Sequence, residues 1–144
     1  MAPRMNAPLY TTEILRLAAS LGEPKSLQRE DGRAELRSPT CGSRIELAVQ
    51  LDADRRVERL SMRVHACAFG QASAALVDQH CIGRNHDEVA AALIVLSRWL
   101  AGEQDDVGEW EGIATLGPAR SRKSRHGAIL LPFRALLAAI EAAG

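Results

Sequence analysis

Aromatic residues are scarce in this chain of 144 residues, which contains two tryptophans, two phenylalanines and one tyrosine. The core must therefore be built from the aliphatic residues that supply most of the 47% hydrophobic content. An excess of one charge is also missing, because 18 basic residues balance 18 acidic ones. This balance gives no electrostatic case for nucleic acid as the main partner.

Long apolar runs are absent as well, since none approaches the roughly 18 residues that would span a membrane. The first six residues lack the apolar centre of a signal peptide, so we expect a cytoplasmic protein with no membrane partner. Three cysteines in a reducing compartment are more typical of free thiols or metal ligands than of a disulfide framework. No repeat or long linker divides the chain, which predicts a single domain over residues 1–144.

Three stretches alternate apolar and polar residues with the period of a β-strand. They are residues 33–37, 44–51 and 59–64, and the last two are joined by a short polar loop at 52–56. Short connections favour an antiparallel meander that is polar on one face and covered by helices on the other. The sequence therefore predicts an α+β fold with a three-stranded antiparallel sheet.

Apolar residues at helical spacing predict four helices around these strands. The first begins at Thr11 or Thr12 and stops before Gly22. The second follows Cys67 and ends by Gly83, and the third is capped by Asn85, with a capping box from Glu88. The last is expected to begin near Pro132, a residue favoured in a first helical turn. Residues 102–112 and 117–127 are predicted to be loops.

Cys41 and Cys67 are the residues most informative about function. Cys41 lies just before the central strand and Cys67 just after the third strand. In an antiparallel meander these positions fall at the same end of the sheet, where two thiols can converge on one metal or cluster. The helix that follows Cys67 presents unpaired N–H groups, which favour a thiolate there. The alternative is that each cysteine is a small buried hydrophobic residue.

The residues around both cysteines resemble those of a known family. Thr-Cys-Gly-Ser at 40–43 precedes a strand, and Ala-Cys-Ala-Phe-Gly-Gln-Ala-Ser at 66–73 opens an alanine-rich helix. Ile-Gly-Arg-Asn-His-Asp-Glu at 82–88 resembles the same family's link between two helices. Together these motifs are similar to the U-type iron–sulfur cluster scaffold family, which includes IscU, SufU and the N-terminal domain of NifU. The resemblance runs from Tyr10 to about Ile140.

The departures from this family fall on the residues that would bind the cluster. The resemblance implies an aspartate after the Cys-Gly pair, where this chain has Ser43. It implies a third cysteine before the last helix, where this chain has Gly127 or Ala128, depending on the alignment. His126 is then the nearest remaining donor, because imidazole binds iron in some clusters and also binds zinc. The predicted metal ligands are therefore Cys41, Cys67 and His126.

Three functions follow from the resemblance. In the first, the chain carries an iron–sulfur cluster or iron, and the set of about four ligands is completed by His126, an external thiol or a second subunit in a homodimer. In the second, a cysteine desulfurase transfers sulfur to Cys67 or Cys41, and no stable cluster forms. In the third, the chain is an interaction protein that keeps the scaffold fold without metal chemistry. The implied partners are a cysteine desulfurase and other cluster-assembly proteins.

Zinc is a further metal that the resemblance implies, although it prefers four good ligands and the chain offers two clear ones. Cys81 lies 14 residues beyond Cys67, or about 21 Å along a helix, so we expect it to be a packing residue. No nucleotide-binding, hydrolase or Cys-x-x-Cys redox motif is found. The sequence thus predicts a carrier of metal or sulfur and not an enzyme.

Overall fold

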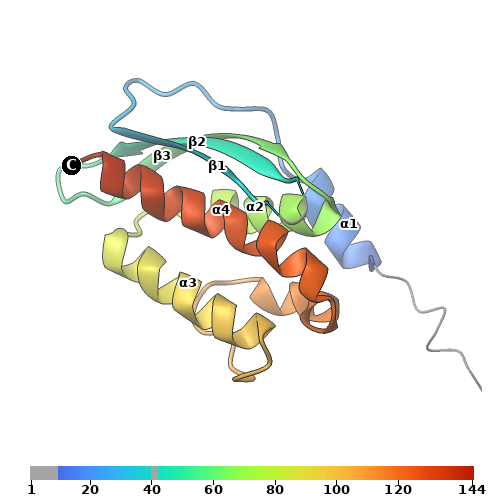
Figure 1. Cartoon of the computed structure of the whole chain (residues 1–144). Helices are drawn as coiled ribbons and strands as arrows, with labels where there is room; N and C mark the ends of the chain where they lie inside the picture. The colour runs from blue at the N-terminus through green and yellow to red at the C-terminus, as the bar shows by residue number, and fades with distance from the viewer. Residues whose placement is uncertain (1–9, 40–41) are drawn as a thin grey trace, which may run out of the picture.

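The computed structural model describes residues 10–39 and 42–144. Their helices and strands follow the predicted order, with one added 3₁₀ helix, labelled η2 (Figure 1). The elements are α1 (Thr12–Ala19), β1 (Gly32–Arg37), β2 (Arg44–Leu51), β3 (Val57–His65), α2 (Ala68–His80), α3 (His86–Leu100), η2 (Ile113–Ser121) and α4 (Lys123–Ala142). No helix in these two ranges is long and apolar enough to cross a membrane.

The three strands form one antiparallel sheet in the order β1-β2-β3, which confirms the predicted meander. Leu36, Ile45 and Val64 are register partners, and all three pack against the core. Helices α2 and α4 cover this inner face of the sheet, and α3 lies beyond them (Figure 1). The α+β class and the one-sided helical cover are therefore both as predicted.

The outer face of the sheet is partly covered by the segment that joins α1 to β1. The backbone N–H of Gln28 donates to the side chain of Gln50 at 3.0 Å. The N–H of Leu51 donates to the Asp31 carboxylate at 2.7 Å, and Arg59 donates to the carbonyl of Ser26. These contacts lie at the end of β2 where the strand leaves the sheet. The other end of the outer face, where β2 begins, holds exposed charged residues.

Both predicted helix caps are confirmed. Thr11, and not Thr12, caps α1, and its hydroxyl accepts a hydrogen bond from the N–H of Ile14 at 3.1 Å. Asn85 accepts from the N–H of Glu88 at 2.9 Å, while the Glu88 carboxylate accepts from the Asn85 N–H at 3.0 Å. This reciprocal pair is a capping box, and it fixes the start of α3.

The predicted loop at 117–127 and the predicted start of the last helix were wrong. Residues 113–121 form η2, and α4 begins at Lys123, so that Pro132 lies inside the helix. Proline removes one intrahelical hydrogen bond, which usually interrupts a helix. Here the helix continues because tertiary packing holds it, and the buried hydroxyl of Ser73 in α2 donates to the carbonyl of Ile129 at 2.6 Å.

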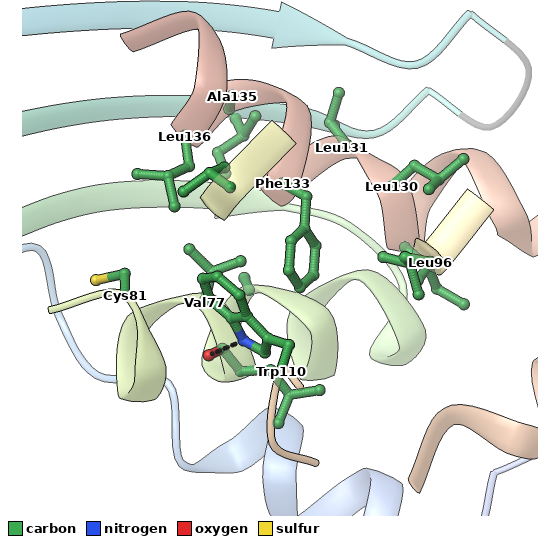
Figure 2. Packing of buried hydrophobic residues seen from close by; sticks show 14 of the residues in the cluster. Val77, Cys81, Leu96, Trp110, Leu130, Leu131, Phe133, Ala135 and Leu136 are labelled. Atoms are coloured by element: carbon green, nitrogen blue, oxygen red, sulfur yellow. Dashed lines mark hydrogen bonds between the residues drawn. The ribbon is translucent and has the colours of Figure 1, made fainter. Parts of the chain in front are cut away.

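The core is mainly aliphatic, as the composition requires, but two of the few aromatic residues lie at its centre. Phe133 of α4 meets the ring of Trp110 at 5.0 Å and nearly edge-on, as Figure 2 shows. The indole N–H of Trp110 donates to the carbonyl of Leu76 in α2 at 3.1 Å. The loop after α3 is thereby attached to both central helices.

Glycine permits two very close contacts between α4 and its neighbours. A methyl group at Gly32 in β1 would overlap with the carbonyl oxygen of Ala139 in α4. A methyl group at Gly70 in α2 would lie 3.3 Å from Cβ of Ala128 and overlap with Ala66. These two contacts set the position of α4 relative to the sheet and to α2.

We predict that Gly32→Ala lowers the free energy of unfolding by about 1–3 kcal/mol, because the added methyl group forces α4 away from β1. Urea denaturation measures this change. Gly22→Ala is the matched control, since a methyl group there has no atom within 4 Å and should alter stability by less than about 0.5 kcal/mol. Equal stability of the two variants would contradict the close contact.

We also predict a histidine-dependent decline in stability as the pH rises. His86 Nε2 lies 2.9 Å from Glu141 and Nδ1 lies 3.1 Å from Asp87, and these hydrogen bonds raise the pKa of His86. The stabilisation is complete below the unfolded-state pKa of about 6.5 and is lost as the pH rises through the higher pKa of the folded protein. His86→Gln should remove this part of the pH dependence of the urea midpoint, and Glu141→Gln should reduce it, because Asp87 still raises the pKa of His86. An unchanged pH slope in either variant would contradict the prediction.

Candidate functional site

Cys67 occupies the N-cap position of α2, between the end of β3 and the first helical turn. Its backbone is extended, and its side chain is half-buried and makes no capping hydrogen bond. The first turn of α2 contains no acidic residue, so the partial positive charge of the helix N-terminus is not offset there. The N–H of Gln71 donates to the carbonyl of Cys67, and its side-chain amide donates to Ala66. The acceptors of both bonds are backbone carbonyls, so neither bond involves the sulfur.

The loop before β2 ends beside Cys67. Arg44 and His65 are register partners, so Ser43 and Cys67 lie just beyond the last pair, at the same end of the sheet. The N–H of Ser38 donates to the carbonyl of Ser43 at 2.8 Å, which closes this loop. Cys41 is outside the described residues, and its neighbour Gly42 is exposed, with a φ of 72° that suits glycine. Ser43 and Cys67 therefore lie at one end of the sheet, while the predicted proximity of Cys41 and Cys67 stays a prediction because Cys41 is outside the described residues.

The position of the missing third cysteine is clarified by the contact between α2 and α4. Gly70 lies one helical turn after Cys67, and a Cβ there would be 3.3 Å from both Cβ and the carbonyl oxygen of Ala128. Ala128 is buried, whereas Gly127 is half-buried and lies about 100° further round the helix. Of the two positions that the sequence left open, Ala128 is the one that faces the helix of Cys67.

His126 lies in the first turn of α4 and is half-buried. Its Nε2 is 2.8 Å from the carbonyl oxygen of Ala119 in η2. A carbonyl can only accept, so Nε2 carries the proton and Nδ1 is the nitrogen that remains to bind a metal. Two residues correspond to about 200° round a helix, which places His126 nearly opposite Ala128.

Cys81 is a core residue, as predicted. It is fully buried at the C-terminal end of α2, and Figure 2 places it at the edge of the hydrophobic cluster. Burial raises the pKa of its thiol to about 12, so almost no thiolate exists near neutral pH. Cys81 is therefore a poor nucleophile and a poor metal ligand.

Basic residues also gather at the sheet end that holds Cys67, a feature that the sequence analysis missed. Arg37, Arg44 and His65 are direct register neighbours on the three strands, and all three are exposed on the outer face. Alternation along each strand assigns these residues to one face. Only the pairing register brings them side by side.

The residues that bear on metal binding are only partly brought together. Ser43, Cys67 and Ala128 belong to one region, and His126 points to the other side of α4. Over residues 10–39 and 42–144, no three His, Cys, Asp or Glu side chains form a group that could hold a metal ion. Among the described residues of this region, Cys67 supplies a thiol, Ser43 supplies only a hydroxyl and Ala128 supplies no donor.

Comparison with known proteins identifies similar sequences. Residues 10–99 match the family model described as the NifU-like N-terminal domain. A curated relative, the iron–sulfur cluster assembly scaffold protein IscU of Streptococcus pyogenes serotype M1, is 30% identical over 84 residues. That match covers 56% of this chain and 52% of the relative, so the chain spans about half the length of the curated protein it matches.

Solved structures are similar over nearly the whole chain. The N-terminal part of a nitrogen-fixing NifU-like protein from Brucella abortus has a TM-score of 0.86 and 29% identity, with 94% of both chains covered. An iron–sulfur cluster assembly scaffold protein for the SUF system from Fervidobacterium islandicum AW-1 has a TM-score of 0.81 over 92% of this chain and 96% of that one. Its identity is 19%, so this second likeness concerns the fold alone.

Proposed function

Because the chain belongs to the NifU-like N-terminal domain family, we propose that it acts in iron–sulfur cluster assembly as a scaffold-like carrier with a reduced ligand set. Its cargo is a cluster, iron, or the sulfur from which a cluster is made. The thiols of Cys41 and Cys67 hold this cargo, and the protein is a carrier and not an enzyme. A cysteine desulfurase and other assembly proteins are its partners.

The single observation that supports this proposal best is the position of Cys67. Its sulfur is half-buried at the N-terminus of α2, without a capping hydrogen bond and without an acidic residue in the first turn. The orphan N–H groups of that turn stabilise negative charge, which a metal-bound thiolate and a persulfide both carry. The loop that contains Cys41 ends at the same end of the sheet, so both thiols can serve one cargo.

Cluster binding by this chain alone is limited by the residues at two positions. Ser43 offers a hydroxyl where a carboxylate would be a better ligand, and Ala128 offers no donor. The contact between Gly70 and Ala128 supports residue 128 as the position of the absent thiol. A cluster on Cys41 and Cys67 then requires a donor from elsewhere, such as His126 Nδ1, an external thiol or a second subunit.

Sulfur acceptance is the second candidate function, and the geometry at Cys67 favours it because no third ligand is required. The Cys67 thiolate attacks the terminal sulfur of a persulfide on the donor protein. The bond between the two donor sulfurs breaks, the donor cysteine leaves as a thiolate, and Cys67 becomes the persulfide. The step is a sulfur transfer with no net change of oxidation state, so no further oxidant or reductant takes part.

We predict that restoring two donors increases cluster retention. Ser43→Asp combined with Ala128→Cys should retain iron and sulfide close to one cluster per chain after anaerobic reconstitution, whereas the unmodified chain retains less, because the donors at this end of the sheet rise from two to four. Absorption and metal analysis measure the result. Ser43→Asp with Gly127→Cys is the matched control, because its new thiol lies on a different side of α4. Equal retention by the two double variants would contradict the proposed site.

Sulfur acceptance predicts a different result. After incubation with a cysteine desulfurase and cysteine, the unmodified protein should gain one sulfur atom on Cys67 or Cys41, which peptide mass spectrometry locates. Cys81 is an internal control and should gain none, because its thiol is buried and its pKa is about 12. Modification of Cys81 alone, or of no cysteine, would contradict this function. A protein that retains neither cluster nor sulfur would be an interaction protein with the same fold.

A further inference from the structure

The outer face of the sheet carries an unusual arrangement of charge next to Cys67. Arg37 and Arg44 lie directly opposite each other on β1 and β2, and His65 lies opposite Arg44 on β3. Like charges at directly opposite positions destabilise a sheet. We call these three residues the basic row.

No acidic side chain among the described residues forms an ion pair with an arginine of the basic row. The neighbouring row contains Glu35 and Glu46, but both are engaged with other arginines. Glu46 lies 3.0 Å from Arg33, which also lies 3.7 Å from Glu35. Within residues 10–39 and 42–144, the side chains of Arg37 and Arg44 have neither an ion-pair nor a hydrogen-bond partner. The two guanidinium groups are therefore available to an external anion.

Protection of a sheet edge does not explain this arrangement. Charged residues on edge strands prevent association between sheets, and Arg37 on β1 could serve that purpose. Arg44 belongs to the central strand, which has no free edge. The row instead borders a depression of about 570 Å³ on the outer face. The segment that covers the other end of this face, near Gln50, leaves the depression open.

The basic row is close enough to influence chemistry at Cys67. Cys67 follows His65 by two residues, or about 7 Å of extended chain, and Arg44 is one strand spacing of about 5 Å further across. The Cα atoms of Arg44 and Cys67 are thus about 9 Å apart, close to the Debye length of about 8 Å at physiological ionic strength. An acidic molecule held by the row would therefore lie at the sheet end that carries Cys67.

We propose that the basic row is a docking surface for an acidic segment of the partner protein that exchanges sulfur or cluster with Cys67. This inference rests on the proposed function for the role of the thiol, while the docking itself depends only on charge. Arg37 and Arg44 bind carboxylates that flank the reactive group of the partner. Steering by opposite charges of this kind raises association rates by about tenfold or more at low ionic strength.

The test uses the rate of thiol–disulfide exchange and needs neither a cluster nor a desulfurase. The protein carries Cys41→Ser, so that Cys67 is the only thiol apart from buried Cys81. Two synthetic peptides carry the same thiopyridyl-activated cysteine, flanked by four glutamates in one and by four glutamines in the other. Attack by Cys67 forms a mixed disulfide with the peptide and releases thiopyridone, whose absorbance gives the rate.

We expect the glutamate peptide to react about tenfold faster than the glutamine peptide at low ionic strength. In the double variant Arg37→Glu with Arg44→Glu, the rate with the glutamate peptide divided by the rate with the glutamine peptide should fall to one or below. In the protein with the basic row intact, high salt should bring the same ratio toward one. Arg98→Glu with Arg134→Glu is the matched control, with the same change of net charge at exposed positions on α3 and α4. This control should keep most of the preference.

An equal loss of preference in both double variants, or no preference with the row intact, would overturn the proposal. A thiopyridyl-activated oligonucleotide that reacts faster than the glutamate peptide would also overturn it, because the row would then favour a nucleic acid. Failure of the reconstitution and persulfide experiments would leave these exchange rates unchanged. The docking surface and the proposed function can therefore fail separately.

Discussion

The close contact of α4 with both β1 and α2 is the constraint on which the rest of the structure depends. Small residues allow it at Gly32 against Ala139 and at Gly70 against Ala128. A buried hydrogen bond from Ser73 of α2 to the carbonyl of Ile129 in α4 holds the two helices together beside the second contact. Because Gly70 lies one turn after Cys67, the same contact that builds the core also positions the helix N-terminus that carries the thiol.

This arrangement explains how a site can have few ligands while the fold is intact. Ser43 and Ala128 are both buried, so each contributes packing that the fold needs. Alanine at 128 packs against Gly70, and serine at 43 belongs to the loop that Ser38 closes. The stability of the core therefore does not require a donor atom at either position. The chain can therefore have the fold of the scaffold proteins although it has few ligands for a metal or cluster.

The parts of the fold that depend on local patterns could be predicted from the sequence. Alternation identified the strands, and the caps at Thr11 and Asn85 followed from side chains that bond to nearby N–H groups. The start of α4 could not be predicted, because Pro132 is a local signal against a helix interior and the contacts that override it come from α2. The sequence also could not decide whether Gly127 or Ala128 stands at the position of the absent third cysteine, because this too depends on contacts with α2. Two neighbouring residues differ there only in which side of a helix they occupy.

The small ligand set and the basic row can be explained by one functional requirement. A site with two protein thiolates holds a cluster less firmly than a site with four ligands, so its cargo depends more on the molecule that delivers or receives it. Fixed arginines beside Cys67 would raise the local concentration of an acidic partner without adding a ligand. The charges act over about a Debye length, whereas ligation requires direct contact. On the proposed function, recognition of the partner then keeps the cargo at a site whose own ligands hold it weakly. The repulsion between Arg37 and Arg44 lowers the stability of the sheet, and this is the cost of placing the recognition surface at the sheet end that carries the thiol.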